Sequence, residues 1–141
     1  MILPVSRGPL LWHRRLDASG DPWETHAIAM PPGAGTGKSV RVMDVNRDGR
    51  NDLVVSCENA AEGKAGLFWL DAVNGQTHPQ WEAHAISGPE GVKFDLLQLV
   101  DLDGDGYLDG LTCEEREQLG VIWYENPGAP WAITVIREVF S

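Results

Sequence analysis

Short apolar runs alternate with short polar turns along the whole chain of 141 residues. No segment of about ten residues or more has its apolar positions at the 3.6-residue spacing of an amphipathic helix. The turns are rich in Gly, Pro, Asn and Asp, as connections between antiparallel strands require. The pattern predicts strands at residues 10–15, 25–30, 40–45, 53–58, 66–72, 83–88, 96–102, 110–115, 120–126 and 133–140.

An internal repeat groups these strands into similar units. Each unit starts with an apolar residue and a Trp, and a second Trp follows after a polar turn; the pairs are Trp12 and Trp23, Trp69 and Trp81, and Trp123 and Trp131. A His-Ala-Ile element follows in the first two units and contains His26 and His84, for which we expect a structural role. A period of about 54–58 residues with four strands per repeat is typical of a propeller blade. We therefore predict an all-β fold of antiparallel, four-stranded β-propeller blades, with the repeated Trp side chains packed between blades.

The predicted strands make about two and a half blades within a partial propeller that spans residues 1–141. Residues 10–30 supply half a blade, residues 40–88 form one blade, and residues 96–140 form another. A closed propeller has about four to eight blades. An unclosed stack exposes a sheet face at each end, which favours association. We therefore expect the chain to be a fragment of a larger propeller, or a piece that completes its ring with other copies.

An acidic turn lies between the first two strands of the last predicted blade. It reads Asp101-Leu-Asp-Gly-Asp-Gly-Tyr-Leu-Asp109. Ca²⁺ takes about six to eight oxygen ligands, and carboxylates at alternate positions of a tight loop can converge on one ion. Gly106 allows the sharp bend that this convergence needs. The predicted ligands are the side chains at positions 1, 3, 5 and 9 and the carbonyl at position 7, namely Asp101, Asp103, Asp105, Tyr107 and Asp109.

A second copy of this turn lies 57 residues earlier, in the same register. Its predicted ligands are the side chains of Asp44, Asn46, Asp48 and Asp52 and the carbonyl of Arg50. An EF-hand is excluded because it needs a Glu at position 12, where this chain has Val55 and Thr112, and because the flanking segments are short and β-branched. We predict two structural Ca²⁺ sites, each across the turn of a β-hairpin. The alternative is a plain Asp/Gly turn without metal.

The two acidic turns and their flanks resemble the FG-GAP/VCBS repeats, which form the propeller blades of integrin α-subunits and of many bacterial extracellular proteins. The segments that carry the resemblance are 42–55, 99–111 and Gly-Val-Ile-Trp-Tyr-Glu-Asn126. The resemblance implies a β-propeller that binds Ca²⁺ in the loops between the first and second strands of its blades, through the ligands named above. Gly110 departs from the family pattern, because an aliphatic strand residue is usual there.

Composition narrows the classes of partner. The formal net charge is −10, and no basic patch is present to meet phosphates, which argues against a nucleic-acid partner. No apolar run approaches the 18 or so residues of a membrane span. The first residues lack the pattern of a secretory signal, although an extracellular or periplasmic location is expected from the repeat type. The cysteines, Cys57 and Cys113, are too few for a zinc site, and they are either a disulfide between repeats or two buried small apolar residues.

Charged residues are expected on the face opposite the acidic turns. The candidates for a ligand-binding face are Glu58, Lys64, Lys93, Glu114 and Arg116, with Glu58 and Glu114 in equivalent positions of the repeat and therefore the best-placed pair. A solvated rim of paired charges is the simpler alternative. No nucleophile motif is present, and we do not expect catalysis from this chain alone. We predict a calcium-stabilised module that binds carbohydrate or protein outside the cytoplasm; the alternative is the propeller part of a carbohydrate-active enzyme, of the polysaccharide lyase or sugar dehydratase type.

Overall fold

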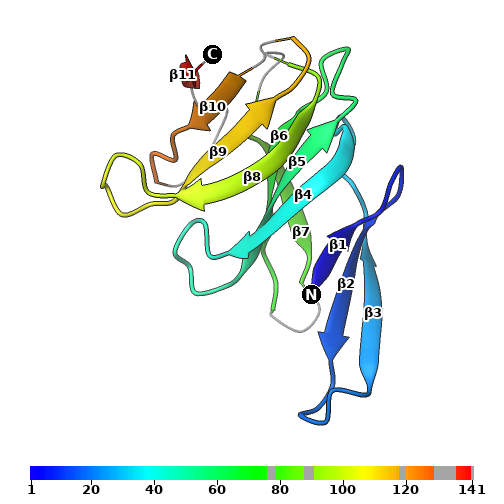
Figure 1. Cartoon of the computed structure of the whole chain (residues 1–141). Helices are drawn as coiled ribbons and strands as arrows, with labels where there is room; N and C mark the ends of the chain where they lie inside the picture. Colours follow the sequence, from blue (N-terminus) through cyan, green and yellow to red (C-terminus); the bar gives the residue numbers. More distant parts are fainter. Residues whose placement is uncertain (76–78, 88–90, 118–119, 129–135, 141) are drawn as a thin grey trace.

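Three antiparallel sheets make up the computed structural model, which describes residues 1–75, 79–87, 91–117, 120–128 and 136–140 (Figure 1). The first sheet contains β1 (Ile2–Pro4), β2 (Leu10–Arg15) and β3 (Trp23–Ile28). The second contains β4 (Thr36–Met43), β5 (Asp52–Glu58), β6 (Leu67–Ala72) and β7 (Trp81–Ala85). The third contains β8 (Phe94–Val100), β9 (Asp109–Glu114), β10 (Gly120–Tyr124) and β11 (Ile136–Phe140). The described residues contain no helix, which confirms the all-β prediction.

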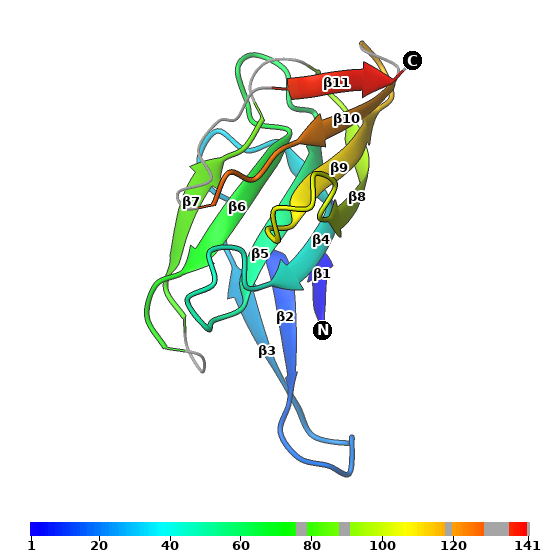
Figure 2. The same ribbon diagram turned by 90° about the vertical axis from the view of Figure 1, so that its left-hand side faces the viewer.

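The strands of each sheet follow one another in chain order, as a propeller blade requires. The second sheet has the order β4-β5-β6-β7 and the third has β8-β9-β10-β11, with antiparallel pairing throughout (Figure 2). Each predicted strand has a counterpart in the structure. The predicted positions Gly88, Trp131 and 133–135 lie outside the described residues.

The first sheet has three strands where the sequence predicted two. The additional strand, β1, pairs with β2 so that Ile2 lies opposite Trp12 and Pro4 opposite Leu10. It escaped prediction because it is only three residues long and contains a proline, which has no N–H to donate to a ladder. Pro4 is compatible with the strand because β1 lies at the edge of its sheet.

Two hydrophobic cores lie between the three sheets. The core between the first and second sheets includes Leu10, Leu53 and Val55, and the core between the second and third includes Val54 and Leu97. Neighbouring residues of a strand point to opposite faces, so β5 supplies both cores in alternation. The second sheet is therefore an inner layer, buried on both faces by its neighbours, as a blade inside a propeller would be.

The repeated tryptophans occupy different environments. Trp69 is buried in the core between the second and third sheets, whereas Trp23 is 49% exposed and so does not pack between blades. The two recurring histidines stack on the Trp that faces them across the strand pair: the ring centroids of Trp69 and His84 lie 4.7 Å apart, and those of Trp12 and His26 lie 5.2 Å apart. These contacts give both histidines a structural role.

The outward face of the third sheet differs from the equivalent face of the second. Val121 is 38% exposed and Leu96 is 64% exposed. Leu67 lies two residues before the Trp of its unit, as Val121 does, but it is buried beneath the third sheet.

In the part of the chain that the structure describes, we find no helix whose length and apolar character would suit a membrane span.

Candidate metal centre

The two acidic turns share one backbone conformation. The first acidic loop (residues 44–52) joins β4 to β5, and the second acidic loop (residues 101–109) joins β8 to β9. Positions 4 and 6 are left-handed in both, with φ of 62° at Arg47 and 86° at Gly49, and 80° at Gly104 and 89° at Gly106. The loops project toward the same side of the molecule (Figure 1). The sequence register between the repeats therefore corresponds to a shared three-dimensional structure.

The first aspartate of each loop closes the turn. Asp44 accepts hydrogen bonds from the backbone N–H of Asp48 at 3.0 Å and of Gly49 at 2.8 Å. Asp101 accepts from Gly104 at 2.7 Å and from Gly106 at 2.9 Å. These bonds hold the loop in a tight ring with its side-chain oxygens on the inside, which is the arrangement that a cation site needs.

Three carboxylates converge in the second acidic loop. One oxygen each from Asp101, Asp103 and Asp109 lie within 4.8 Å of one another. Oxygens that share one Ca²⁺ at 2.3–2.6 Å can lie up to about 5 Å apart, so this spacing suits the ion. Asp105 accepts the N–H of Tyr107 at 2.8 Å, which orients the turn at the position whose carbonyl is the predicted backbone ligand. The donor set is therefore compatible with a hard divalent cation.

The last aspartate of each loop is buried and ties the loop to the third strand of its sheet. Asp109 accepts the N–H of Leu102 at 3.0 Å and that of Asn126 at 2.8 Å. Asp52 accepts the N–H of Val45 at 3.0 Å and that of Ala72 at 3.0 Å. The sequence predicted both residues only as metal ligands, because the bonds to Ala72 and Asn126 come from chain segments that no local pattern brings together.

Burial gives Asp52 an unusual protonation equilibrium. Desolvation raises the pKa of its carboxyl group above the ordinary value of 3.8. The two backbone N–H bonds oppose this shift, and the nearby carboxylates of Asp71 and Asp48 add to it. Burial therefore disfavours the ionised form of Asp52, and the two backbone hydrogen bonds offset part of this desolvation penalty.

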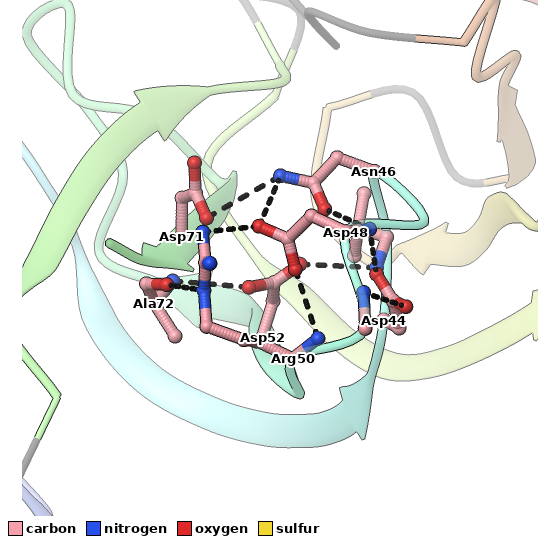
Figure 3. A network of polar contacts seen from close by, with 9 residues as sticks. Asp44, Asn46, Asp48, Arg50, Asp52, Asp71 and Ala72 are labelled. Carbon is pink, nitrogen blue, oxygen red and sulfur yellow. Dashed lines mark hydrogen bonds and ion pairs between the residues drawn. The ribbon is translucent and has the colours of Figure 1, made fainter. Parts of the chain in front are cut away.

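Side-chain contacts distinguish the first acidic loop from the second (Figure 3). Asp48 accepts the backbone N–H of Arg50 at 2.8 Å through Oδ1, as Asp105 accepts that of Tyr107, but it also forms an ion pair with Nη2 of Arg50 through Oδ2. Nε of Arg50 donates to the carbonyl of Ala72. Nδ2 of Asn46 donates to Asp48 Oδ2 at 3.3 Å. Among the described residues, a cluster of three acidic ligand atoms is found only in the second loop.

Arg47 joins the two loops. Its guanidinium carbon lies 4.1 Å from the centroid of the Tyr107 ring, and Nη2 donates to the carbonyl of Gly106. A guanidinium over an aromatic ring is attracted by the negative face of the ring. This contact was not predictable from a local pattern, because it joins Arg47 to residues 59 and 60 positions further along the chain.

The predicted ligand face is a row of ion pairs that crosses from the second sheet to the third. Lys38 Nζ lies 3.6 Å from Glu58 and 3.8 Å from Asp95, and Lys93 Nζ lies 3.1 Å from Asp95 and 2.6 Å from Glu115. Hydrogen bonds to Glu115 and Asp95 raise the pKa of Lys93 above its ordinary value. Glu58 and Lys93 are therefore both engaged with neighbouring side chains.

Glu114 does not lie on that face. It is 1% exposed, and its carboxylate accepts four backbone N–H groups, from Val92, Lys93, Arg116 and Glu117, at 2.6–3.1 Å. It organises the loops at the end of β9 rather than presenting a charge to a ligand. Arg116 is exposed beside it.

Lys64 belongs to a separate groove on this side of the molecule. The groove has a volume of about 450 Å³ and lies between the connections that follow β1, β3 and β5. Its lining includes Arg7, Met30, Thr36, Asn59 and Lys64. The five predicted face residues therefore occupy different environments and form no single site.

The cysteines are both free, so no disulfide joins the repeats. Cys57 is fully buried in the core between the first and second sheets, and burial raises the pKa of its thiol to about 12. Cys113 is partly exposed. Cys57 therefore behaves as a small apolar residue of the core.

Comparison with known families matches residues 44–112 to a family described as an FG-GAP-like repeat. The matched segment begins at the first aspartate of the first acidic loop, includes all of the second loop and ends within β9. Comparisons with curated proteins and with solved structures find no match. Residues 44–112 therefore match the FG-GAP-like repeat family, the family whose resemblance the two acidic loops carry.

Proposed function

We propose that the chain is a calcium-stabilised β-propeller repeat module that binds a ligand outside the cytoplasm, and that its calcium site is the second acidic loop. The observation that carries the calcium part is the convergence of the Asp101, Asp103 and Asp109 oxygens within 4.8 Å. Four aspartates and no basic residue lie in this loop, so without a cation the like charges repel one another. The role of Ca²⁺ is structural: it supplies the positive charge that lets the loop close.

Calcium bound by Asp109 would also stabilise the rest of the third sheet. Asp109 is the first residue of β9 and binds the N–H of Asn126, which follows β10. A cation bound to the folded state alone stabilises it by about 2.7 kcal/mol at a hundredfold excess over the dissociation constant. For a chain of this size, that corresponds to roughly 5–15 °C in melting temperature.

Thermal unfolding with added Ca²⁺ and with EDTA tests the calcium part of the proposal. We expect Ca²⁺ to raise the melting temperature and Mg²⁺ to raise it less, because Mg²⁺ keeps its own water ligands. Asp103→Asn keeps an acceptor for the N–H of Asp105 but removes a charged ligand, and should abolish the response. Asp21→Asn, an exposed carboxylate in the turn before β3, is the matched control and should keep it. Identical curves for the wild type in Ca²⁺ and EDTA would overturn the proposal.

For the ligand we propose the groove lined by Arg7 and Lys64. Its volume of about 450 Å³ is in the usual range for ligand pockets, and these two cations are the charged residues among its described lining. Arg7 and Asn59 also have positive φ, of 55° and 54°, which is a strained conformation often kept for function. An acidic saccharide suits this lining. Polygalacturonate binding measured by calorimetry should be lost in Arg7→Ala/Lys64→Ala and kept in Arg15→Ala; equal binding by all three proteins would exclude the groove.

A further inference from the structure

We propose that the first acidic loop binds no calcium because the guanidinium of Arg50 engages Asp48, one of the carboxylates that the ion would need, so that the chain takes up one Ca²⁺ rather than two. The inference rests on the proposed calcium role of the second loop. It departs from the symmetry of the sequence, in which both loops have oxygen donors at the same positions. The difference that matters most lies at position 7, which is Arg50 in one loop and Tyr107 in the other; position 3 is Asn46 in the first loop and Asp103 in the second.

The side chain of Arg50 extends toward the third strand of its sheet, with its guanidinium between Asp48 and Ala72 (Figure 3). Its Nη2 forms the ion pair with Asp48 Oδ2, and its Nε donates to the carbonyl of Ala72 at the end of β6. The guanidinium is thus fixed at two points, on the loop and on the third strand. Such a charge-assisted bond is stronger than one between neutral groups, and an arginine is always protonated, so the positive charge is permanent.

The Asn46 side chain, at position 3 of the first loop, also contacts carboxylates that could bind a cation. Asn46 offers Nδ2 to Asp48 Oδ2 at 3.3 Å, and the same nitrogen lies 3.5 Å from Asp71 Oδ1. Its Oδ1 accepts the N–H of Asp48 at 3.1 Å, as Oδ1 of Asp103 accepts the N–H of Asp105 in the second loop. The difference is Nδ2 of Asn46, an N–H donor at the position where the second loop has another carboxylate oxygen. The first loop therefore offers the ion fewer oxygens than the second.

Charge supports the same conclusion. The first acidic loop has three carboxylates, Asp44, Asp48 and Asp52, and its Arg50 pairs with Asp48, whereas its Arg47 reaches the Gly106 carbonyl of the second loop. The second loop has four carboxylates and no basic residue of its own. The first loop therefore has one carboxylate fewer than the second and pairs another with its own arginine, so it needs an external cation less. The hairpin of β4 and β5 should accordingly keep its structure when calcium is removed.

Calcium stoichiometry measured by isothermal titration calorimetry tests the inference. We expect one site per chain in the wild type, two in Arg50→Gln, and none in Asp103→Asn. Arg50→Gln/Asp103→Asn should return to one site, now in the first loop. The matched control is Arg41→Gln, which removes the same charge from β4, where the Arg41 guanidinium donates to Ser39 Oγ and to the Val40 carbonyl; it should keep one site.

The outcomes separate the inference from the proposed function. Two sites in the wild type would overturn the inference and leave the calcium proposal intact. No site in the wild type would overturn the calcium proposal. A folded Arg50→Gln variant with one site would show that Arg50 does not exclude the ion. If Arg50→Gln does not fold, Asp44→Asn decides, because loss of a first-loop carboxylate should leave stoichiometry and affinity unchanged; a tenfold or greater loss of affinity, or the loss of a site, would overturn the inference.

Discussion

Gly66 and Phe94 are in direct contact across the interface between the second and third sheets. A Cβ on Gly66 would lie 2.0 Å from Cε2 and 2.1 Å from Cδ2 of the Phe94 ring. Phe94 is fully buried and belongs to the core that joins these two sheets. The sheets therefore approach as closely as they do because residue 66 has no side chain.

Gly66→Ala should destabilise the protein by about 1–3 kcal/mol, because an added methyl group in a packed core forces neighbouring atoms to move. Urea unfolding followed by Trp fluorescence measures the change. Gly37→Ala is the control, since its new Cβ would meet nothing closer than 3.4 Å. Phe94→Leu in the Gly66→Ala background should recover part of the loss. Equal costs for Gly66→Ala and Gly37→Ala would show that the contact does not limit the approach of the sheets.

Asp52→Asn should destabilise the protein by about 1–3 kcal/mol at neutral pH, with or without calcium. An amide keeps one acceptor oxygen, so the N–H of either Val45 or Ala72 loses its partner in a buried site. Urea unfolding in EDTA measures this cost. Asp48→Asn, whose side chain is not buried, should cost less under the same conditions.

The cost of Asp52→Asn should also depend on pH. The pKa of Asp52 is raised in the folded state, so its favourable contribution is largest below the unfolded pKa and falls as pH rises through the folded pKa. The stability difference between wild type and Asp52→Asn should therefore grow when the pH is lowered from 7 toward 4. The other carboxylates titrate in both proteins and cancel in the difference. A difference that shrinks on acidification would contradict the direction of the shift.

The repeat made most of the fold predictable. Alternating apolar positions placed the strands, and two turns in the same register identified their hairpins as equivalent. The position of β1 was not accessible, because a three-residue edge strand with a proline has almost no pattern of its own. The strand is identified only through its pairing with β2.

Glu114 shows why repeat equivalence is unreliable over short distances. The sequence placed it beside Glu58, because each glutamate follows a cysteine. Counting from the last aspartate of each loop gives another result: Glu114 lies five residues after Asp109, as Cys57 lies five residues after Asp52. Both of these side chains are buried, since the direction in which a strand residue points depends on its distance from the loop. Glu114 follows its loop aspartate by five residues and Glu58 by six, so their side chains point to opposite faces of the sheet.

The two acidic loops show a second limit of the sequence. The two loops share one backbone conformation, as the shared register predicted, but the side chain of position 7 was treated only as the source of a carbonyl. The ion pair between Arg50 and Asp48 is accompanied by a hydrogen bond from Arg50 to the carbonyl of Ala72, which belongs to another strand. Such a contact requires the fold, and a loop motif alone does not contain it.

Cys113 should be the thiol that reacts with iodoacetamide in the native protein. Cys57 is fully buried, and its pKa of about 12 keeps the thiol protonated, whereas the thiolate is the reactive form. Mass spectrometry of peptides after brief alkylation measures the modification of each residue. Both cysteines should react in urea. Rapid modification of Cys57 in the native state would indicate that the first and second sheets separate easily.

The same thiol should make the protein sensitive to alkali. The folded pKa of Cys57 is raised from 9.0 to about 12, so its contribution to stability is complete below pH 9 and is lost as the pH rises toward 12. Cys57→Ala leaves a small cavity and should be less stable than the wild type at pH 8. The gap should narrow by up to about 1.4 kcal/mol per pH unit above 9. Parallel stability curves for the two proteins between pH 8 and pH 11 would exclude this role.

Glu114→Gln should destabilise the protein more than any single change to the neighbouring surface charges. The carboxylate of Glu114 accepts four backbone N–H groups, and glutamine can accept through only one oxygen, with an NH₂ group facing the other two donors. Hydrogen bonds to charged groups contribute about 1.5–3 kcal/mol, and buried donors are left without partners. We expect a loss of about 3 kcal/mol in urea unfolding. Glu115→Gln is the adjacent control: it removes an exposed ion pair with Lys93 and should change stability by about 0–1 kcal/mol. If the two variants were equally stable, the bonds seen at Glu114 would not organise the end of β9, and its carboxylate would again be a candidate for the ligand face.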